Sequence, residues 1–594
     1  MTVRAVPYGA EAVLVDLPDL AAVRALDDAL RAEPPTGAVD VVPAARTVLV
    51  RFGSASAATA GLDAILSAAR RVPGAVHGPG DPVPGGSPAP GGSPAPGGAP
   101  ADARDARPGH AASPTARQPR HPASPAHAAS PAHPATVVLP VRYEGADLAE
   151  VARTTGLDEA EVVRRHAAAT YTVAFGGFMP GFAYLTGLDP ALRVPRRSSP
   201  RERVPEGSVA IAGEFAAVYP GATPGGWMLL GTCDVPLFDV RREPPALLRP
   251  GTRVRFVAAA TAPGTSTPSA HAAAVEPPPG PTTHASEGAD RAPRTGPARA
   301  RTLEVLDPGV LTLVQDRGRP GLAAVGVGRS GAADAGAARL ANRLVGNTAG
   351  AAVLEVLLGG IELRFPQGGV IALAGAEAPA WVDGSPVAPH AATAVLPGGT
   401  LRAGQATRGL RLYVSVRGGV DVPAVLGSRS ADQLSGIGPG PLRAGDVLAI
   451  GTEVQEAAQP WADPPRTWAQ PAVLRVLPGP RPDWFEPEAL AALCGSDYAV
   501  TPAGNRVAVR LDGPSVRRID RGELPSEPLV PGAVQVPPDG RPVVFGADHP
   551  VTGGYPVLAV LDAASRDVAA QLRPGDRVVF RPVPDRPAGP RTDT

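Results

Sequence analysis

Two long segments without hydrophobic periodicity divide this 594-residue chain and limit what it can fold into. Residues 74–135 contain near-repeats such as GGSPAPGGSPAPGGAP and SPAHAASPAHPA, and residues 258–300 are rich in Ala, Pro, Thr and Gly. Such segments bury too little apolar surface to offset the conformational entropy lost on folding, so we predict two disordered linkers. The folded parts are then residues 1–73, 136–257 and 301–583, with a tail at 584–594.

The first part, residues 1–73, alternates strand-like and helix-like runs. AVLVDL and TVLVRF are typical of strands, and DLAAVRALDDALRAE and ATAGLDAILSAARRV have the apolar spacing of amphipathic helices. This alternation predicts a small α/β domain at the N-terminus.

The other parts consist mainly of short apolar runs between Gly and Pro. YTVAF, SVAIAG, AAVYP, WMLLG and TRVRFV predict a closed or nearly closed barrel over 136–257. Residues 301–455 and 456–583 show the same pattern. Because RPGTRVRFV, RAGDVLAIG and RPGDRVVFRP close the three segments, we expect three related β modules. The predicted fold class is mainly β with α+β parts, with tandem β-barrels and a small N-terminal α/β domain.

The phrase LAEVARTTGLDEAEVVRRHAAA predicts two short helices joined at Gly156, with Asp158 as N-cap and Glu161 completing a capping box. This pattern resembles a DNA-binding helix-turn-helix. However, 56 basic and 56 acidic residues give a formal net charge of zero, which leaves no basic excess to hold phosphates. We therefore interpret it as a structural hairpin and expect no nucleic-acid partner.

Every basic residue is arginine, because the sequence contains no lysine. Lysine forms Schiff bases, carries biotin and completes the P-loop, so none of these chemistries can reside on this chain. Cys233 and Cys494 are too far apart in sequence to suggest a disulfide framework or a zinc site, and we expect a cytoplasmic location. We also expect no membrane span and no metal site, since no HExxH motif or metal-ligand cluster occurs.

The phrase GVGRSG at 326–331 has the G-x-G-x-x-G spacing of a dinucleotide-binding fingerprint, with Glu355 further along the chain. The strand-like run before it is only LAAV, and no parallel βαβ unit surrounds it. We therefore expect no dinucleotide there. Instead, the glycines are expected to turn the backbone into a helix that carries Asp334, Arg339 and Asn342.

Two regions combine turn residues with polar side chains. Residues 175–231 place arginines among many glycines, which suits an anion-binding surface, although tight barrel corners beside a solvated loop are the alternative. Residues 314–347 gather polar groups suited to orienting an amide or a carboxylate. His549 follows Asp548, but adjacent residues on a strand face opposite sides, so we expect no preformed dyad.

Longer phrases resemble known families. FGGFMPGFAYLTGL, PRRSSPRERVPEGSVAIAG and VYPGATPGGW are similar to the KipI, or allophanate hydrolase subunit 1, family. LVQDRGRPG, GVGRSGAAD, SVRGGVDVPAVLGSRS, AVQVPPDGRP and TGGYP are similar to the KipA, or allophanate hydrolase subunit 2, family of biotin-dependent carboxyltransferase-like proteins. The resemblance covers everything except the linkers, and it implies cyclophilin-like barrels.

In bacteria such pairs are implied to be the B and C subunits of the ATP-dependent 5-oxoprolinase. The resemblance thus implies a fused B–C component that works with a LamB/YcsF-type A subunit to hydrolyse 5-oxo-L-proline to L-glutamate. ATP with Mg²⁺ is the implied cofactor, no biotin is expected on this chain, and a homodimer is left open. Two alternatives are the carboxyltransferase component of a urea carboxylase or urea amidolyase, and a KipI/KipA-type regulator of a sensor kinase.

Site residues are carried over from the matching phrases. The implied catalytic residues are Asp316, Asp334 and His166, with Asp316 or Asp334 as the proton acceptor. The implied substrate- and phosphate-binding residues are Arg196, Arg201, Tyr184, Gly225, Gly226, Trp227, Gln315, Arg319, Ser330, Asn342, Arg429, Gln535, Thr552 and Tyr555. The sequence departs from the family patterns at Gly231-Thr232-Cys233, where an arginine contact is missing, and at Asn505-Arg506-Val507-Ala508.

Overall fold

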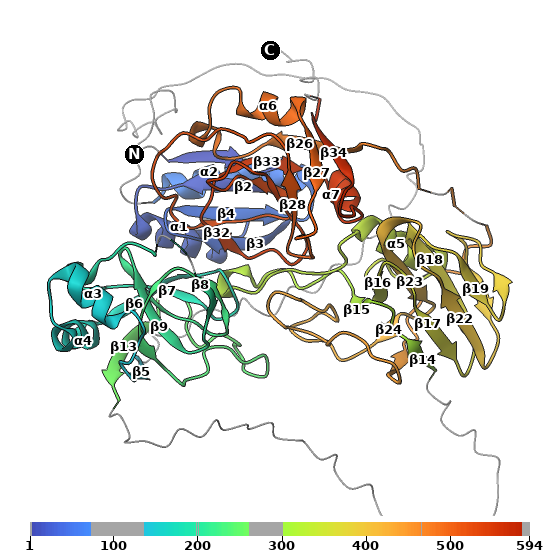
Figure 1. The fold of residues 1–594 in the computed structure, drawn as a ribbon, viewed down its shortest axis with the longest axis horizontal. Helices are drawn as coiled ribbons and strands as arrows, with labels where there is room; N and C mark the ends of the chain where they lie inside the picture. The colour runs from blue at the N-terminus through green and yellow to red at the C-terminus, as the bar shows by residue number, and fades with distance from the viewer. Residues whose placement is uncertain are drawn as a thin grey trace, which may run out of the picture.

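The computed structural model describes residues 3–72, 136–259 and 301–584, except 198, 200, 462 and 465. The predicted linkers and tail lie outside these described residues, apart from 258, 259 and 584. Figure 1 shows the N-terminal domain in blue against an orange-red barrel, with a green barrel and a yellow module below them. Within the described ranges, no helix combines the length and the apolar character that a membrane crossing requires.

The N-terminal domain is a four-stranded antiparallel sheet with two helices. Its strand order is β1-β2-β4-β3. Strands β2 and β4 are buried along their whole length, because the helices cover one face and the last barrel covers the other. The elements are β1 (Arg4–Pro7), β2 (Ala12–Asp16), α1 (Leu20–Ala32), β3 (Ala38–Pro43), β4 (Thr47–Phe52) and α2 (Ala55–Arg70).

The first barrel is a seven-stranded sheet in the order β12-β9-β10-β7-β6-β13-β5. An isolated bridge between Arg142 and Thr232 nearly closes it. Its elements are β5 (Val137–Val141), α3 (Leu148–Thr155), α4 (Glu159–Ala168), β6 (Tyr171–Gly176), β7 (Ala183–Thr186), β8 (Arg201–Val204), β9 (Ser208–Ala212), β10 (Phe215–Val218), β11 (Thr223–Gly225), β12 (Met228–Thr232) and β13 (Arg253–Ala258).

Helices α3 and α4 form the predicted hairpin. Gly156 ends α3 in the left-handed region, at φ 71°, and the Asp158 side chain accepts a hydrogen bond from the Glu161 N–H at 2.7 Å. Val151 and Val162 join the core of the barrel. The hairpin is therefore packed as a structural element against the sheet, as we interpreted it.

The last barrel is closed, in the order β26-β33-β30-β31-β28-β27-β34. Its elements are β26 (Ala472–Pro478), α6 (Ala489–Gly495), β27 (Asp497–Val500), β28 (Ala508–Asp512), β29 (Glu527–Pro528), β30 (Ala533–Gln535), β31 (Val543–Phe545), β32 (Thr552–Gly553), β33 (Val557–Leu561), α7 (Ala563–Ala569) and β34 (Arg577–Pro582). In both barrels the final strand pairs in parallel with the first one, and the other strands follow in the same order. The two barrels therefore repeat one topology, and the prediction of a mainly β fold with tandem barrels is confirmed.

The middle module has a different architecture: a seven-stranded sheet, β20-β19-β22-β17-β14-β25-β24, and a five-stranded sheet, β15-β16-β23-β18-β21, share one core. Its elements are β14 (Thr302–Asp307), β15 (Leu311–Gln315), α5 (Ala335–Leu344), β16 (Val353–Leu357), β17 (Glu362–Phe365), β18 (Gly369–Glu377), β19 (Ala380–Val382), β20 (Ser385–Pro386), β21 (Thr393–Val395), β22 (Gly399–Ala403), β23 (Arg408–Val416), β24 (Val420–Asp421) and β25 (Val447–Ile450).

Our expectation of three related modules is therefore wrong for the middle one. Its last strand, β25, pairs antiparallel with β14, whereas the barrels end on a parallel pair. The similar phrases that close the three segments encode the same kind of turn. The glycine of each phrase has a φ between 85° and 90°: Gly251, Gly445 and Gly575. A tight turn before a strand is local, and it does not determine how that strand pairs.

A buried ion-pair network joins the N-terminal domain to the last barrel. Arg481 donates from Nη1 to Asp16 on β2 at 3.0 Å, and from Nε to both oxygens of Glu527 at 2.8 and 3.0 Å. The three side chains are only 10–13% exposed. One guanidinium thus pairs with two carboxylates at the interface between parts that are far apart in sequence.

We expect Arg481→Ala to lower the free energy of unfolding by about 3–5 kcal/mol, because it leaves two buried carboxylates without a counter-charge. Urea denaturation measures the loss, and hydrogen exchange of the β2 amides locates it. The exposed Arg577–Asp497 pair is the matched control, and we expect Arg577→Ala to change stability by less than about 1 kcal/mol. Equal effects of the two substitutions would contradict the role assigned to Arg481.

Candidate functional site

A cavity of about 410 Å³ lies where the N-terminal domain, the middle module and the last barrel meet. Its lining includes three acidic side chains, those of Glu11, Asp316 and Asp567. It also includes seven arginines, so the lining is positively charged: Arg51, Arg317, Arg329, Arg339, Arg411, Arg506 and Arg566. We call this space the arginine cavity.

The GVGRSG loop forms one wall of the arginine cavity. A single 3₁₀ turn (Ala323–Val325), not a strand, precedes it, and Ser330 has a left-handed backbone with φ 53°. Asp334 then caps α5 by accepting a hydrogen bond from the Ala337 N–H at 2.8 Å. The loop therefore lacks the strand–turn–helix context of a dinucleotide fingerprint, in agreement with the prediction.

A buried network centred on Arg506 fixes this loop. Arg506 donates from Nε and Nη2 to Asp548 at 2.7 and 2.9 Å, and from Nη2 to the Gly331 carbonyl at 2.6 Å. Its Nη1 donates to Glu355 on β16, and the Ser330 hydroxyl donates to Asp548 at 2.6 Å. Glu355 thus pairs with arginine inside the protein, rather than being positioned to bind a ribose.

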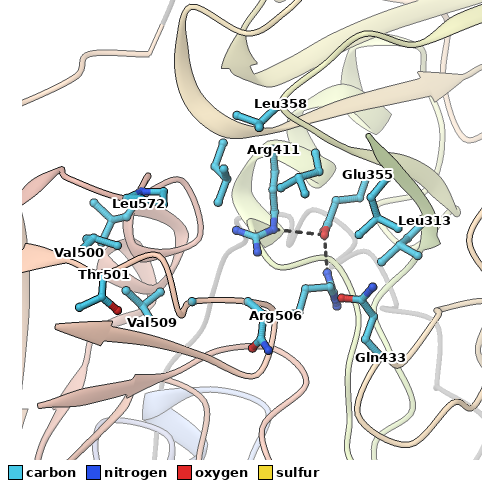
Figure 2. Close-up of a pocket in the computed structure, with 16 residues that line it drawn as sticks. Leu313, Glu355, Leu358, Arg411, Gln433, Val500, Thr501, Arg506, Val509 and Leu572 are labelled. Atoms are coloured by element: carbon cyan, nitrogen blue, oxygen red, sulfur yellow. Dashed lines mark hydrogen bonds and ion pairs between the residues drawn. The ribbon is translucent and has the colours of Figure 1, made fainter. Parts of the chain in front are cut away.

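A second cavity, of about 270 Å³, borders the same network (Figure 2). In Figure 2, Glu355 lies between the guanidinium groups of Arg411 and Arg506. Most of the remaining lining is apolar and comes from the middle module and the last barrel: Leu311, Leu313, Leu357, Leu358, Leu410, Val500, Val509, Leu572 and Pro574. The charged network thus lies between a polar cavity and an apolar one.

The two carboxylates predicted as proton acceptors hold the backbone in place. Asp316 accepts from the N–H groups of Gly318 and Arg429 at 2.7 Å each, and from the hydroxyls of Ser428 and Ser430 at 2.6 and 2.5 Å. Asp334 is 1% exposed, and besides capping α5 it accepts from Arg466 and Gln571. These contacts argue against a catalytic proton transfer at either residue.

Several other predicted residues lie in or near the arginine cavity, and each makes at least one polar contact, although Gln315 Oε1 and the Nε and Nη1 atoms of Arg319 are buried without a partner. Gln315, Ser330 and Asn342 line the cavity. Gln315 donates to the Ala431 carbonyl at 2.8 Å, and Asn342 accepts from Ser415 at 2.7 Å. Arg319 is buried and donates to the Ser430 carbonyl, and burial lowers its pKa. Arg429 pairs with Asp421 at 2.6 Å.

The residues predicted from the first family lie elsewhere, mostly on the outer face of the first barrel. Tyr184 stacks on Phe175, and its hydroxyl is 3.1 Å from the Ser526 hydroxyl of the last barrel. Trp227 packs edge-on against Tyr184, and the Gly226 carbonyl accepts from the Arg197 N–H at 2.8 Å.

The predicted anion-binding arginines on this face have acidic neighbours. Arg201 donates to the buried Asp147 at 2.6 Å, and Arg196 lies 3.9 Å from Glu523. Gly225 has no space for a side chain, because a Cβ there would lie 2.6 Å from the Tyr219 hydroxyl.

Three residues predicted from the second family also lie at this barrel–barrel contact or next to it. Thr552 accepts from the Phe178 N–H of the first barrel at 2.8 Å. Gln535 donates to the Tyr555 carbonyl at 2.7 Å, and the Tyr555 side chain is 42% exposed. None of these residues lines either of the two cavities described. The structure thus places part of the predicted set at an interface between barrels and another part in the arginine cavity, and the remaining residues line neither cavity.

His166 has the position of a core residue. It is fully buried among aromatic rings, with the Phe256 centroid at 4.6 Å and the Tyr171 centroid at 5.4 Å. Its Nδ1 is 2.8 Å from the Tyr143 hydroxyl, and burial lowers its pKa to about 3. This placement argues against the catalytic role that we predicted.

The residues of the arginine cavity that sequence reasoning missed include Arg51, Arg329, His549 and Arg566. Arg329 lies inside the GVGRSG phrase, and Arg51 interrupts the apolar run TVLVRF, so both had a local signal. The sequence signal for His549 was only its neighbour Asp548. In the structure, the Asp548 carboxylate is bound to Arg506 and Ser330.

The buried, neutral state of His166 predicts a pH dependence of stability. Because its folded pKa lies below the unfolded value of 6.5, the unfolded state takes up the proton first, and stability falls as the pH drops below about 6.5. We expect His166→Phe to remove about 3 kcal/mol of the stability that wild type loses between pH 7 and pH 4. Urea denaturation at both pH values measures this difference, and parallel losses in the two proteins would contradict it.

We predict that replacing Arg506 reverses the effect of acid on the stability that Glu355 contributes. Burial alone raises the pKa of Glu355, but Arg506 and Arg411 outweigh it and lower the pKa. In wild type, the stability from Glu355 is therefore present above the unfolded pKa of 4.5 and lost at lower pH. We expect Arg506→Met to cost about 3–5 kcal/mol at pH 7 and to recover part of it on acidification, because protonation neutralises a buried carboxylate that has lost one of its two arginine partners. Addition of Glu355→Gln should reduce that recovery, whereas an unchanged pH profile would contradict this account.

Comparison with known proteins gives two family matches. The family described as "Carboxyltransferase domain, subdomain A and B" matches residues 325–582. The family described as "Carboxyltransferase domain, subdomain C and D" matches residues 3–76 and 112–248. The crystal structure of TTHA0988 is 34% identical, with a TM-score of 0.73, and the match covers 98% of this chain and all of that one.

Curated relatives match separate parts of the chain. The C subunit of the 5-oxoprolinase from Escherichia coli K12 is 36% identical over 47% of this chain and 90% of its own length. The B subunit of the 5-oxoprolinase from E. coli O157:H7 is 52% identical over 20% of this chain and 57% of its own length. Urea amidolyase of Saccharomyces cerevisiae is 33% identical over 47% of this chain but only 16% of its own length. The chain therefore belongs to the carboxyltransferase-domain family that includes the B and C subunits of 5-oxoprolinase, and it joins both parts in one polypeptide.

Proposed function

We propose that this chain is the B–C component of an ATP-dependent 5-oxoprolinase. Together with a LamB/YcsF-type A subunit, it hydrolyses 5-oxo-L-proline to L-glutamate in the cytoplasm, with cleavage of ATP. The observation that carries this proposal is the arginine cavity. The part that matches subdomains C and D supplies Glu11, Arg51, Phe52 and Gly53, and the part that follows residue 301 supplies the rest of the lining. A site built from both parts explains why one reaction would need both.

The chemistry of the cavity suits this reaction. A lactam carbonyl is a poor electrophile, and phosphorylation of its oxygen by ATP makes it susceptible to water. The substrate carboxylate and the phosphate are both anions, for which guanidinium groups are strong, geometrically matched donors. Arg329 has no acidic partner within 4 Å among the described residues, so its charge is available for a ligand.

The phosphates of ATP and the Mg²⁺ ion would bind different groups of the cavity, namely cationic side chains and acidic ones. The arginines would hold phosphate oxygens, whereas the acidic side chains are largely engaged: Glu11 lies 3.0 Å from Arg566, and Asp316 holds its own loop. Among the described residues, no group of three or more His, Cys, Asp or Glu could hold a metal ion. We therefore propose that Mg²⁺ arrives with the nucleotide, rather than on a site formed by this chain.

The similarity to urea amidolyase supports a second candidate, the carboxyltransferase component of a urea carboxylase system. This reaction would require a biotin carrier on another chain, because the present sequence contains no lysine to carry biotin.

A reconstitution assay tests the proposal. The full chain is mixed with a LamB/YcsF-type protein, and glutamate release from 5-oxoproline and ATP hydrolysis are measured. We expect glutamate release only when both proteins and ATP are present, with ATP hydrolysis coupled to it. Each protein alone is the control, and urea with a biotinylated carrier tests the second candidate. Carboxylation of urea without glutamate release from well-folded partners would overturn our first choice.

A further inference from the structure

His549 is held in one tautomer at the edge of the arginine cavity. Its Nδ1 lies 2.8 Å from the Pro550 carbonyl oxygen. A carbonyl can only accept, so Nδ1 carries the proton and Nε2 carries a free lone pair. The side chain is 4% exposed and lines the cavity, and Nε2 has no hydrogen-bond partner among the described residues. His549 Nε2 is not one of the fully buried side-chain atoms that lack a partner, so it is open to the cavity.

Charged groups from three parts of the chain surround this imidazole. Arg51 comes from β4 and Arg566 from α7, and both act electrostatically on His549 together with Asp548 of its own loop. Their acidic partners only partly offset these charges: Arg51 lies 3.7 Å from Asp40, and Arg566 lies 3.0 Å from Glu11.

Arg329 adds an unpaired cation to the same group. Arg51 and Arg566 act on it electrostatically, as do Asp40 and Glu11, and its side chain donates to the Arg317 carbonyl at 3.3 Å. Arg51, Arg329 and Arg566 thus outnumber Asp40 and Glu11 around the cavity that His549 also lines, and the Asp548 carboxylate is bound to Arg506 and Ser330. An anion is the ligand that would neutralise the excess positive charge.

We propose that Arg329 and His549 form an anion-dependent acid–base site, in which a carboxylate or phosphate pairs with Arg329 and His549 Nε2 accepts a proton from water. This inference rests on the proposed function for its reaction. The oxygen of the attacking water bonds to the lactam carbon, and its proton passes to Nε2. When the carbon–nitrogen bond breaks, the imidazolium returns that proton to the leaving nitrogen, and the hydroxyl proton goes to solvent. Because ATP has phosphorylated the lactam oxygen, this leaves an acyl phosphate, which a second water hydrolyses to glutamate and phosphate.

The surroundings make this base depend on the ligand. Burial, together with Arg51 and Arg566, lowers the pKa of His549 to about 4, so the empty site is neutral at pH 7. A bound anion offsets the arginine charges and raises the pKa, which strengthens the base only when a ligand is present. Anion binding is therefore linked to proton uptake by His549 at mildly acidic pH.

His549→Asn is the sharpest test, because its amide can still donate to the Pro550 carbonyl but has no acceptor in place of Nε2. In the full chain with its LamB/YcsF-type partner, we expect it to lower kcat by about 10²–10⁴-fold with little change in KM. Arg329→Gln should instead raise KM by about tenfold or more. His390→Asn is the matched control, because His390 Nδ1 bonds the Pro464 carbonyl at 2.9 Å and lines neither cavity. A His549→Asn variant with wild-type kcat would overturn the catalytic role.

A binding measurement separates this inference from the proposed function. Calorimetry at about pH 5.5 in two buffers of different ionisation enthalpy measures proton uptake on adding 5-oxoproline, inorganic phosphate or ATP to the full chain. We expect uptake with at least one anion for wild type and His390→Asn, and none for His549→Asn. The anion that gives uptake distinguishes a carboxylate from a phosphate ligand. Uptake that persists in His549→Asn would overturn the site, whether or not 5-oxoproline proves to be the substrate.

Discussion

The arrangement of the middle module and the last barrel depends on one buried guanidinium. Arg506 neutralises Glu355 of the middle module and Asp548 of the last barrel, and it also binds the Gly331 carbonyl of the GVGRSG loop. An arginine can do this because its planar fork has five donors, whereas a lysine ammonium is a point charge with three. Both cavities border this group, which also holds the loop that carries Arg329.

The two fused parts of the chain also pack against each other and together form one cavity. The N-terminal domain belongs to the part that matches carboxyltransferase subdomains C and D, but its sheet packs on the last barrel, which belongs to the other part. Arg51 thereby reaches a cavity whose other walls lie hundreds of residues away along the chain. Fusion in one polypeptide keeps these surfaces at a high effective concentration, which favours a site that neither part forms alone.

Local patterns predicted local structure well. The helical hairpin with Gly156 and Asp158, the strands between Gly and Pro, and the absence of a dinucleotide fold at GVGRSG all follow from short-range chemistry. The same reasoning failed where a role depends on burial. Asp316, Asp334 and His166 are polar residues in suggestive phrases, but their neighbours use them for a loop, a helix cap and a barrel core.

The sequence by itself determined the turns, the periodicity of the strands and the exclusion of lysine chemistry, because each depends on residue type over a few positions. It also carried the phrases from which the family was expected. Only the tertiary structure decided that the middle module is not a third barrel, and that Arg51, Arg329, Arg566 and His549 surround one cavity. The physical reason is that strand pairing, desolvation and charge neutralisation depend on contacts between parts far apart in the chain, which no local pattern encodes.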